Sequence, residues 1–246
     1  MSVIFIGDRA VGKTNFIYHL CSQRVEKVTV TNRTQADFIL SPQGNIEPTT
    51  SLNKESLHLQ MRLIAPRRVE VQWLDTPGEM WRSDWQQTNA LLWQDIVQQA
   101  AESQGIVVLL PPHRDLGIRD PQVIIDHEIP SAQQWMQRFE SRWMPFFLER
   151  CPRARHIALC IHKADLFLDS QQLQTESQKL VYNPSPRGMD WVDRNRYLKD
   201  KYFRPIHAQI QAIDKAIYGM TVRCFITSTQ NRSLLELPWL YLGAYL

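Results

Sequence analysis

Short apolar runs alternate along the chain with longer stretches of helical pattern. Runs rich in β-branched residues predict core strands at 3–6, 57–64, 69–74, 105–110, 156–161 and 222–227. Between them, apolar residues spaced three and four apart predict helices over 13–23, 88–102, 132–149 and a stretch near 205–218. Strands that alternate with helices favour βαβ units and a mostly parallel sheet.

The spacing of the runs also predicts how the domain is organised. The strands at 57–64 and 69–74 flank a short turn and predict a hairpin, which gives the sheet one antiparallel edge strand. We interpret 1–246 as a single domain with insertions near 25–44, 111–131 and 171–204. In the first insertion, 27–30 and 36–40 have the pattern of an extra hairpin.

Two further segments are predicted to pack on the domain. The run 191–203 mixes aromatic, basic and acidic residues, which favours an amphipathic helix over a nucleic-acid surface. The apolar segment 234–246 is predicted to be packed, with a partner-docking or membrane-docking tail as the alternative.

Composition narrows the class of protein. The chain has 246 residues and a formal net charge of +3, with no long basic run, so no nucleic-acid partner is expected. The cysteines are scattered and form no metal-binding spacing. Since no stretch approaches about 18 consecutive apolar residues, no transmembrane segment is expected and a cytoplasmic location is predicted.

A phosphate-binding loop lies between the first predicted strand and the first predicted helix. It matches G-x-x-x-x-G-K-[ST] and consists of Gly7, Asp8, Arg9, Ala10, Val11, Gly12, Lys13 and Thr14, with Asn15 following. Glycines let the backbone fold around a polyphosphate, and N–H groups at the helix N-terminus point at it. Lys13 supplies a cation for the β- and γ-phosphates, and the Thr14 hydroxyl can bind Mg²⁺.

Other polar motifs follow predicted strands. Asp75 and Gly78 form a D-x-x-G motif, which predicts a contact to Mg²⁺ through water and one to the γ-phosphate. Thr49 is the first candidate, and Thr50 the second, for the threonine that completes the metal's coordination; Thr34 is a weaker candidate. An ordinary turn at Asp75 and loop hydroxyls at Thr49 and Thr50 are the alternatives.

A third motif, after the strand at 156–161, is similar to the [NT]-K-x-D sequence that recognises guanine. His162 stands at its first position, Lys163 at its second, and Asp165 at its last. An aspartate can accept hydrogen bonds from N1 and N2 of guanine, whereas adenine has no such pair of donors. The His162 imidazole departs from the amide of that motif, and its charge can change near neutral pH. Ser228 and Thr229, after the last strand, loosely match a segment that contacts the base.

Together these motifs resemble those of Ras-like small GTPases of the TRAFAC class, with a Rab-like phosphate loop and a divergent bacterial character. The resemblance implies an α/β, three-layer P-loop NTPase fold with a mostly parallel six-stranded sheet, one antiparallel edge strand and insertions. It also implies GTP and GDP as ligands, Mg²⁺ bound by Thr14, Thr49 and Asp75, and a regulated partner protein. The partner would contact the Thr49 region and the Trp81–Trp85 segment.

Two residues predict slow GTP hydrolysis. Arg9 stands where compact GTPases often carry glycine, and its guanidinium is either solvated or directed at the γ-phosphate. Glu79 stands where a glutamine usually orients the attacking water, and its charge repels the phosphate. We therefore name Lys13, Glu79 and Arg9 as candidate catalytic residues. A pseudo-GTPase scaffold that binds nucleotide without significant turnover is the alternative.

Overall fold

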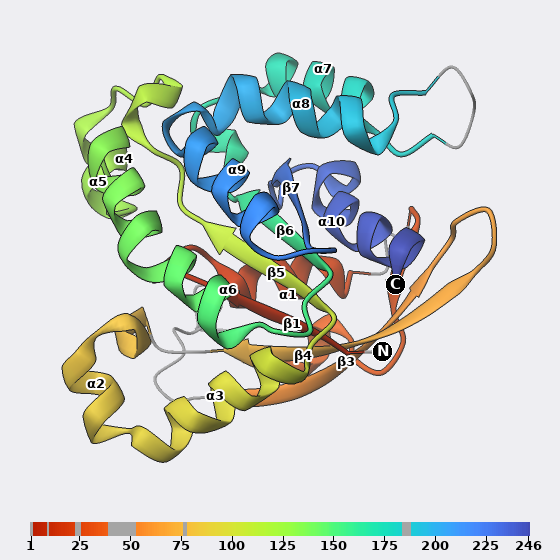
Figure 1. Ribbon diagram of the computed structural model, residues 1–246. Coiled ribbons are helices and arrows are strands. Elements are labelled where there is room, and N and C mark those ends of the chain that lie inside the picture. The colour runs from red at the N-terminus through yellow and green to blue at the C-terminus, as the bar shows by residue number, and fades with distance from the viewer. Residues whose placement is uncertain (1, 9, 23–25, 39–52, 76–77, 184–187) are drawn as a thin grey trace.

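A single mixed sheet forms the centre of the molecule (Figure 1). The computed structural model describes residues 2–246 apart from 9, 23–25, 39–52, 76–77 and 184–187. Within these residues, seven strands lie in the order β2-β3-β4-β1-β5-β6-β7. Their bounds are β1 Ser2–Gly7, β2 Val28–Val30, β3 Asn53–Met61, β4 Arg67–Asp75, β5 Gly105–Leu110, β6 His156–Ile161 and β7 Thr221–Ile226.

The strand pairing confirms the mostly parallel sheet and corrects its count. β4, β1, β5, β6 and β7 are parallel neighbours, whereas β3 is antiparallel to β4 as the hairpin predicted. β2 pairs antiparallel with β3, so this edge has two antiparallel strands and the described sheet has seven strands rather than six. β2 is short for a strand, but both of its valines are buried against the sheet. The predicted hairpin between 27–30 and 36–40 is therefore wrong. Part of 36–40 forms the 3₁₀ helix η1 (Gln35–Asp37), and residues 39–40 lie outside the described residues.

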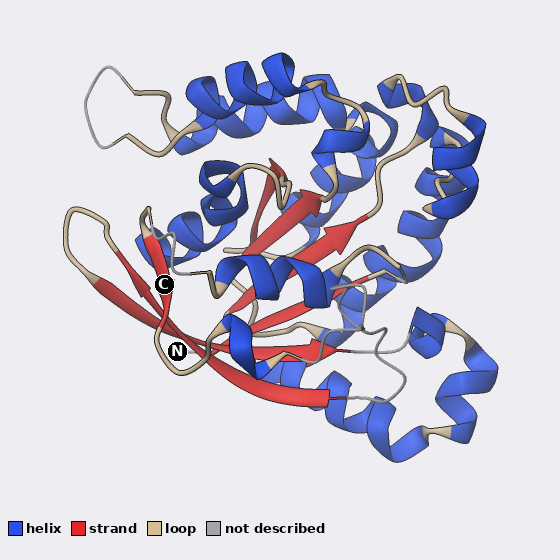
Figure 2. Ribbon diagram, turned by 180° about the vertical axis from the view of Figure 1, so that it is seen from behind, coloured by secondary structure: helices blue, strands red, loops and turns tan. Residues whose placement is uncertain are grey.

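Helices cover both faces of the sheet, giving the predicted three layers. α3, α6 and α9 cross one face, as Figure 1 shows, and α1 lies with α10 on the other, which Figure 2 shows from behind. The described α-helices are α1 Lys13–Leu20, α2 Ser83–Thr88, α3 Ala90–Glu102, α4 Pro121–Asp126, α5 Ala132–Arg138, α6 Met144–Arg150, α7 Ser170–Leu180, α8 Trp191–Tyr202, α9 His207–Ala216 and α10 Arg232–Tyr245.

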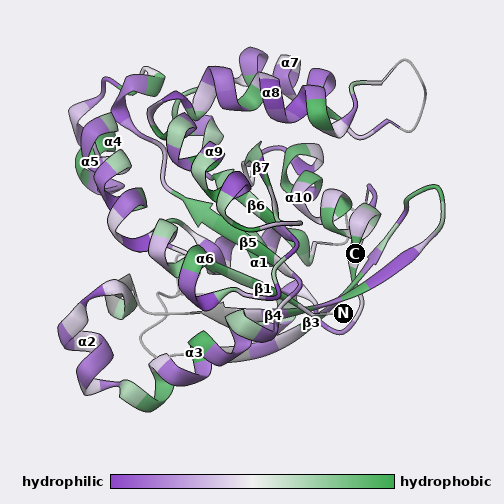
Figure 3. Ribbon diagram, in the orientation of Figure 1, coloured by the Kyte–Doolittle hydropathy of each residue, from purple (hydrophilic) through white to green (hydrophobic). Residues whose placement is uncertain are grey.

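The core lies between these layers. Every residue of β5 is buried, and in β6 only His156, its first residue, is partly exposed, as expected for central parallel strands covered on both faces. Figure 3 shows both strands mostly in the green of hydrophobic residues. α10 buries most of the apolar 234–246 segment against the sheet, and α8 packs on β7, so both predicted packed segments are confirmed. Among the described residues, no helix is long and apolar enough to cross a bilayer.

The helix predicted over 132–149 is interrupted. α5 and α6 are joined by the π-helical turn η4 (Phe139–Trp143), in which the Met144 N–H donates to the carbonyl of Phe139, five residues earlier. Pro145 explains the interruption, because a proline lacks the N–H of an α-helical bond and its ring clashes with the preceding turn. The extra residue in this turn changes the direction of the side chains that follow Phe139.

Candidate nucleotide-binding site

The phosphate loop connects β1 to α1 at the carboxyl edge of the parallel strands. The Asp8 N–H donates to the Leu109 carbonyl of β5 at 3.1 Å, which holds the start of the loop against the sheet. A Cβ on Gly7 would lie 2.8 Å from that same carbonyl oxygen, so the close approach requires glycine. Gly12, with φ of 93°, precedes α1 in the left-handed region, and its carbonyl accepts from the Phe16 N–H at 2.8 Å.

Lys13 lies inside this loop. Its ammonium group donates to the carbonyls of Asp8 at 3.3 Å and Gly7 at 3.5 Å, and the residue is buried. Val11 is buried beneath the loop, whereas Ala10 and Asn15 are exposed and Thr14 is half-buried in the first turn of α1. Ala10 has a φ of 53°, so the backbone enters the left-handed region there as well, shortly before Lys13.

The loop after β6 lies directly against the phosphate loop. The His162 ring packs on Phe16 of α1 at 5.3 Å between centroids, and its Nδ1 lies 3.0 Å from the Thr227 hydroxyl. Burial, assisted by the nearby Lys163 charge, lowers the pKa of His162 to about 3. The expectation of a titration near neutral pH is therefore wrong: the imidazole is neutral there, because it is only 1% exposed.

Lys163 joins the two loops. It adopts a left-handed backbone with φ of 61°, and its ammonium group donates to the Ala10 carbonyl at 2.8 Å. The same ammonium group lies 3.2 Å from Nδ1 of His127, which follows α4 in the 111–131 insertion. Burial lowers the pKa of Lys163, and Asp165 and Glu128 oppose this effect.

Asp165 lies at the same edge, in the 3₁₀ turn η5 (Ala164–Leu166). Ser228 donates a hydrogen bond from its hydroxyl to Oδ1 of Asp165, and the Gln230 amide lies 3.4 Å from Oδ2. The serine hydroxyl also accepts from the Gln230 N–H at 3.0 Å, so one side chain orders both the turn after β7 and the carboxylate. Thr229 is half-buried beside them. The structure thus brings together Lys13, Lys163, Asp165 and Ser228, which come from segments far apart in the sequence.

The D-x-x-G segment is described in part. Asp75 is the last residue of β4, and Gly78 and Glu79 begin the 3₁₀ helix η2 (Gly78–Trp81). β4 pairs with β1 through Phe5 and Trp73, so continuing that register by two residues sets the backbone of Asp75 beside Gly7. Arg9, Thr49 and Thr50 lie outside the described residues. Thr34 caps η1 and binds Asp37 at 3.1 Å.

The tryptophans that follow Glu79 belong to an aromatic cluster. Trp81 packs on Trp143 at 4.4 Å, on Phe146 at 5.3 Å and on Trp93 at 6.0 Å between ring centroids. Trp85 is half-buried and also contacts the core. The segment after Gly78 is therefore packed against η4 and α6 through Trp81.

Sequence reasoning missed three polar side chains at this site. His127 contacts Lys163, Gln230 approaches Asp165, and Arg142 of η4 has a guanidinium nitrogen 4.0 Å from Oδ1 of Asp8. Each contact spans many residues or depends on the π-helical turn, so no local motif marks it. The spacing of Arg138 and Arg142 by four residues was the one available signal, since such residues share a helix face.

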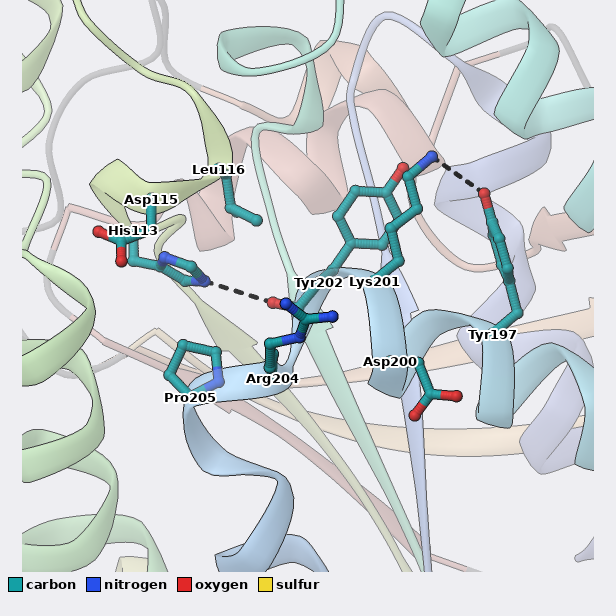
Figure 4. Close-up of a pocket in the computed structure, with 9 residues that line it drawn as sticks. All are labelled: His113, Asp115, Leu116, Tyr197, Asp200, Lys201, Tyr202, Arg204 and Pro205. Atoms are coloured by element: carbon teal, nitrogen blue, oxygen red, sulfur yellow. Dashed lines mark hydrogen bonds between the residues drawn. The ribbon is translucent and has the colours of Figure 1, made fainter.

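A separate cavity of about 780 Å³ lies between residues 113–116 and 197–205 (Figure 4). It is bordered by the 3₁₀ helix η3 (Arg114–Leu116) and by the end of α8, where the His113 Nε2 contacts the Tyr202 carbonyl at 3.3 Å. The charges around it are mixed, because Asp115, Asp200, Lys201 and Arg204 all line it. The residues that line it are different from those the sequence predicted, and their mixed charges favour no one class of ligand.

Comparison with known proteins shows a distant likeness in fold. The chain matches no protein-family model and no curated protein. Its fold is similar to that of the Arl6 BBS3 small GTPase from Trypanosoma brucei, a structure with the bound nucleotide analogue GppNp. The two chains are 9% identical, the match covers 99% of this chain and 95% of that chain, and the TM-score is 0.45. A likeness this distant assigns neither a ligand nor a partner.

Proposed function

We propose that this protein is a GTP- and GDP-binding switch that hydrolyses GTP slowly with Mg²⁺ and regulates a partner protein. The observation that carries the proposal is the Lys163 bridge to Ala10, which joins a phosphate loop to a candidate guanine-binding loop. Within the same turn, Asp165 is held by Ser228 with its second carboxylate oxygen near the exposed Gln230 amide. A phosphate loop alone would indicate only a nucleotide of unspecified base.

The base would be recognised by Asp165. Its carboxylate can accept hydrogen bonds from guanine N1 and N2, and Ser228 keeps one oxygen oriented for this purpose. The long contact from Gln230 involves an exposed side chain and can give way to the base at little cost. The aliphatic stem of Lys163 would cover one face of the purine, because its ammonium end is already fixed on Ala10.

The phosphates would be bound by the loop backbone and Lys13. The N-terminus of α1 carries the positive end of the helix dipole, which favours an anion. Lys13 would exchange its carbonyl contacts of 3.3 and 3.5 Å for charge-assisted bonds to phosphate oxygens. The left-handed backbones of Ala10 and Gly12, and the close approach of Gly7 to the sheet, would allow the chain to surround the ligand closely.

The residues at this edge fit Mg²⁺ by their chemistry. The metal prefers hard oxygen ligands, and Thr14 offers a hydroxyl while Asp75 ends the strand beside Gly7. Thr49, or Thr50 in its place, would complete the set from outside the described residues. When bound, Mg²⁺ would neutralise charge on the β- and γ-phosphates.

Hydrolysis is expected to be slow. Lys13 would stabilise the charge that develops on the phosphates, whereas Glu79 brings a negative charge toward the attacking water. Arg9 is the third candidate catalytic group, and in this role it would direct its guanidinium at the γ-phosphate. We expect intrinsic turnover no faster than about 10⁻³ per second, with a partner at the Thr49 and Trp81–Trp85 segments able to raise it.

Calorimetric titration tests the proposal. Nucleotide-free protein is titrated with GDP, a non-hydrolysable GTP analogue and an ATP analogue, each with Mg²⁺. Guanine-selective binding that disappears in Asp165→Asn, but persists in the exposed control Asp193→Asn, supports the proposal. Equal affinity for both bases would reject the assignment of Asp165. A phosphate-release assay on the same samples then separates a slow GTPase from a scaffold without turnover.

A further inference from the structure

The phosphate loop contains a buried acid. Asp8 is 5% exposed, although the ligand proposed for this loop is itself strongly negative. Among the described residues, its Oδ1 accepts no hydrogen bond. Burial raises the pKa of Asp8, and the positive charges of Arg142, Arg138 and Lys13 oppose that rise. An ionised carboxylate at this position would repel a polyphosphate unless a cation compensates it.

Arg142 is the cation closest to that oxygen. One of its guanidinium nitrogens lies 4.0 Å from Oδ1 of Asp8, which is an ion-pair distance and longer than a hydrogen bond. Its side chain is 35% exposed while that of Asp8 is 8% exposed, so the pair spans the boundary between the loop and solvent. The positive charge of Arg138, four residues earlier, also lowers the pKa of this carboxyl.

The π-helical turn places Arg142 there. Because η4 contains one residue more than an α-helical turn, the side chains after Phe139 are rotated relative to those of α5. Trp143, the next residue, is 1% exposed; its ring stacks on Phe147 at 5.9 Å and packs at a tilt on Trp81 at 4.4 Å between centroids. These ring contacts fix the backbone of η4, so Arg142 projects from a rigid support rather than from a loose loop.

We propose that Arg142 is a positioning residue of the nucleotide site, which acts by neutralising Asp8 so that the phosphate loop can accept a nucleoside diphosphate or triphosphate. This inference rests on the proposed function. Arg142 would bind no substrate atom itself; it would remove the electrostatic penalty that the buried carboxylate imposes on the phosphates. The charged groups around Asp8 are Arg142 and Arg138 from the α5–η4 segment and Lys13 from α1.

Charge compensation gives a direct test. GDP affinity with Mg²⁺ is measured for wild type, Arg142→Gln, Asp8→Asn and the double variant, with Arg150→Gln at the exposed end of α6 as the matched control. Arg142→Gln should weaken GDP binding by about tenfold at pH 8, or about 1.4 kcal/mol. The double variant should recover to within about threefold of wild type, because the uncharged amide that replaces the carboxylate needs no counterion.

The pH dependence distinguishes this role from a purely structural one. In Arg142→Gln the carboxyl of Asp8 takes up a proton more readily, so GDP affinity should rise toward that of the Arg150→Gln control as the pH falls from 8 to 5.5. Loss of affinity that neither Asp8→Asn nor low pH restores would overturn the proposal, since Arg142 would then contact the nucleotide or support the fold. Equal affinity of Arg142→Gln and the Arg150→Gln control would overturn it as well.

The two proposals fail in different ways. If wild type binds GDP and ADP equally, the guanine assignment fails, while the Arg142 comparison still applies to either nucleotide. If wild type binds GDP selectively and Arg142→Gln matches the control, the Arg142 proposal alone fails. If wild type binds neither nucleotide, both are rejected, and the Asp8–Arg142 pair is then a structural contact only.

Discussion

The ammonium group of Lys163 and the carbonyl oxygen of Ala10 are joined by a hydrogen bond of 2.8 Å between residues 153 positions apart. This bond connects the loop after β6 with the loop after β1. Two segments that a nucleotide would contact at opposite ends are therefore held in one arrangement by the protein's own contacts. Such preorganisation lowers the entropic cost of ordering the two loops when a ligand binds.

Removing the ammonium group of Lys163 should weaken nucleotide binding. Lys163→Met keeps most of the aliphatic stem but loses the charge-assisted bond to Ala10, so we expect GDP affinity to fall by at least about tenfold. Calorimetry measures the affinity, and Lys215→Met on the exposed side of α9 is the control. Unchanged affinity in Lys163→Met would show that the bridge has no part in binding.

The buried His162 predicts an acid-sensitive fold. Its folded pKa of about 3 lies below the ordinary value of 6.5, so the unfolded chain binds the proton more readily. The contribution of the neutral His162 to the free energy of unfolding is therefore fully present above pH 6.5 and is lost as the pH falls from 6.5 toward 3. At pH 5 this loss is about 2 kcal/mol.

An asparagine at this position cannot take up that proton. In His162→Asn, urea unfolding should show a loss of stability between pH 7 and pH 5 that is smaller than the wild-type loss by about 2 kcal/mol. His207→Asn, a partly exposed histidine on α9, should leave the wild-type loss unchanged. Equal acid losses in His162→Asn and wild type would contradict the assignment of His162 as a neutral core group.

The sequence was sufficient to predict that the loops after β1 and β6 meet, because both loops lie where parallel strands end. Apolar runs located β1, β5 and β6, and parallel strands bring their carboxyl ends to one edge, so Lys13, Lys163 and Asp165 could be expected to meet. The phosphate loop has fixed spacing and a strand before it, which makes its prediction independent of the rest of the chain.

The remaining features depend on tertiary structure. Val28–Val30 is too short to mark a strand of the main sheet by its own pattern, and its pairing depends on a surface that β3 provides. The periodic 132–149 segment gave no sign of a π-helical turn, although Pro145 was a reason to expect a break. Arg142 reaches the site through that turn and His127 through the 111–131 segment, so apart from the spacing of Arg138 and Arg142 no short-range pattern points to these contacts.

Replacing Glu79 with glutamine should increase the rate of GTP hydrolysis. Glu79→Gln replaces a negative charge near the proposed γ-phosphate with a neutral amide that can orient water, so GTP hydrolysis should become faster by about tenfold. Single-turnover phosphate release with Mg²⁺ measures the rate, with Glu149→Gln on the exposed end of α6 as the control. A slower rate in Glu79→Gln would indicate that the carboxylate accepts a proton from water and is needed for catalysis.

Ser228 should determine the preference for guanine over adenine without changing how the phosphates are bound. Its hydroxyl donates to Oδ1 of Asp165 and is fully buried, so Ser228→Ala leaves that oxygen without its hydrogen bond and the carboxylate free to rotate. We expect the preference for GDP over ADP to fall by about tenfold, mainly through weaker GDP binding, because ADP makes no use of Asp165.

The double-mutant cycle with Asp165→Asn decides whether Ser228 acts through the carboxylate. If it does, Ser228→Ala should change GDP affinity by less than about twofold in the Asp165→Asn background, since the group that it positions is already altered. A full tenfold effect in both backgrounds would instead assign the loss to the turn after β7, where the same hydroxyl accepts from the Gln230 N–H at 3.0 Å. The exposed Ser170→Ala serves as the control in each background, because it is remote from this turn and tests for a general effect of removing a hydroxyl.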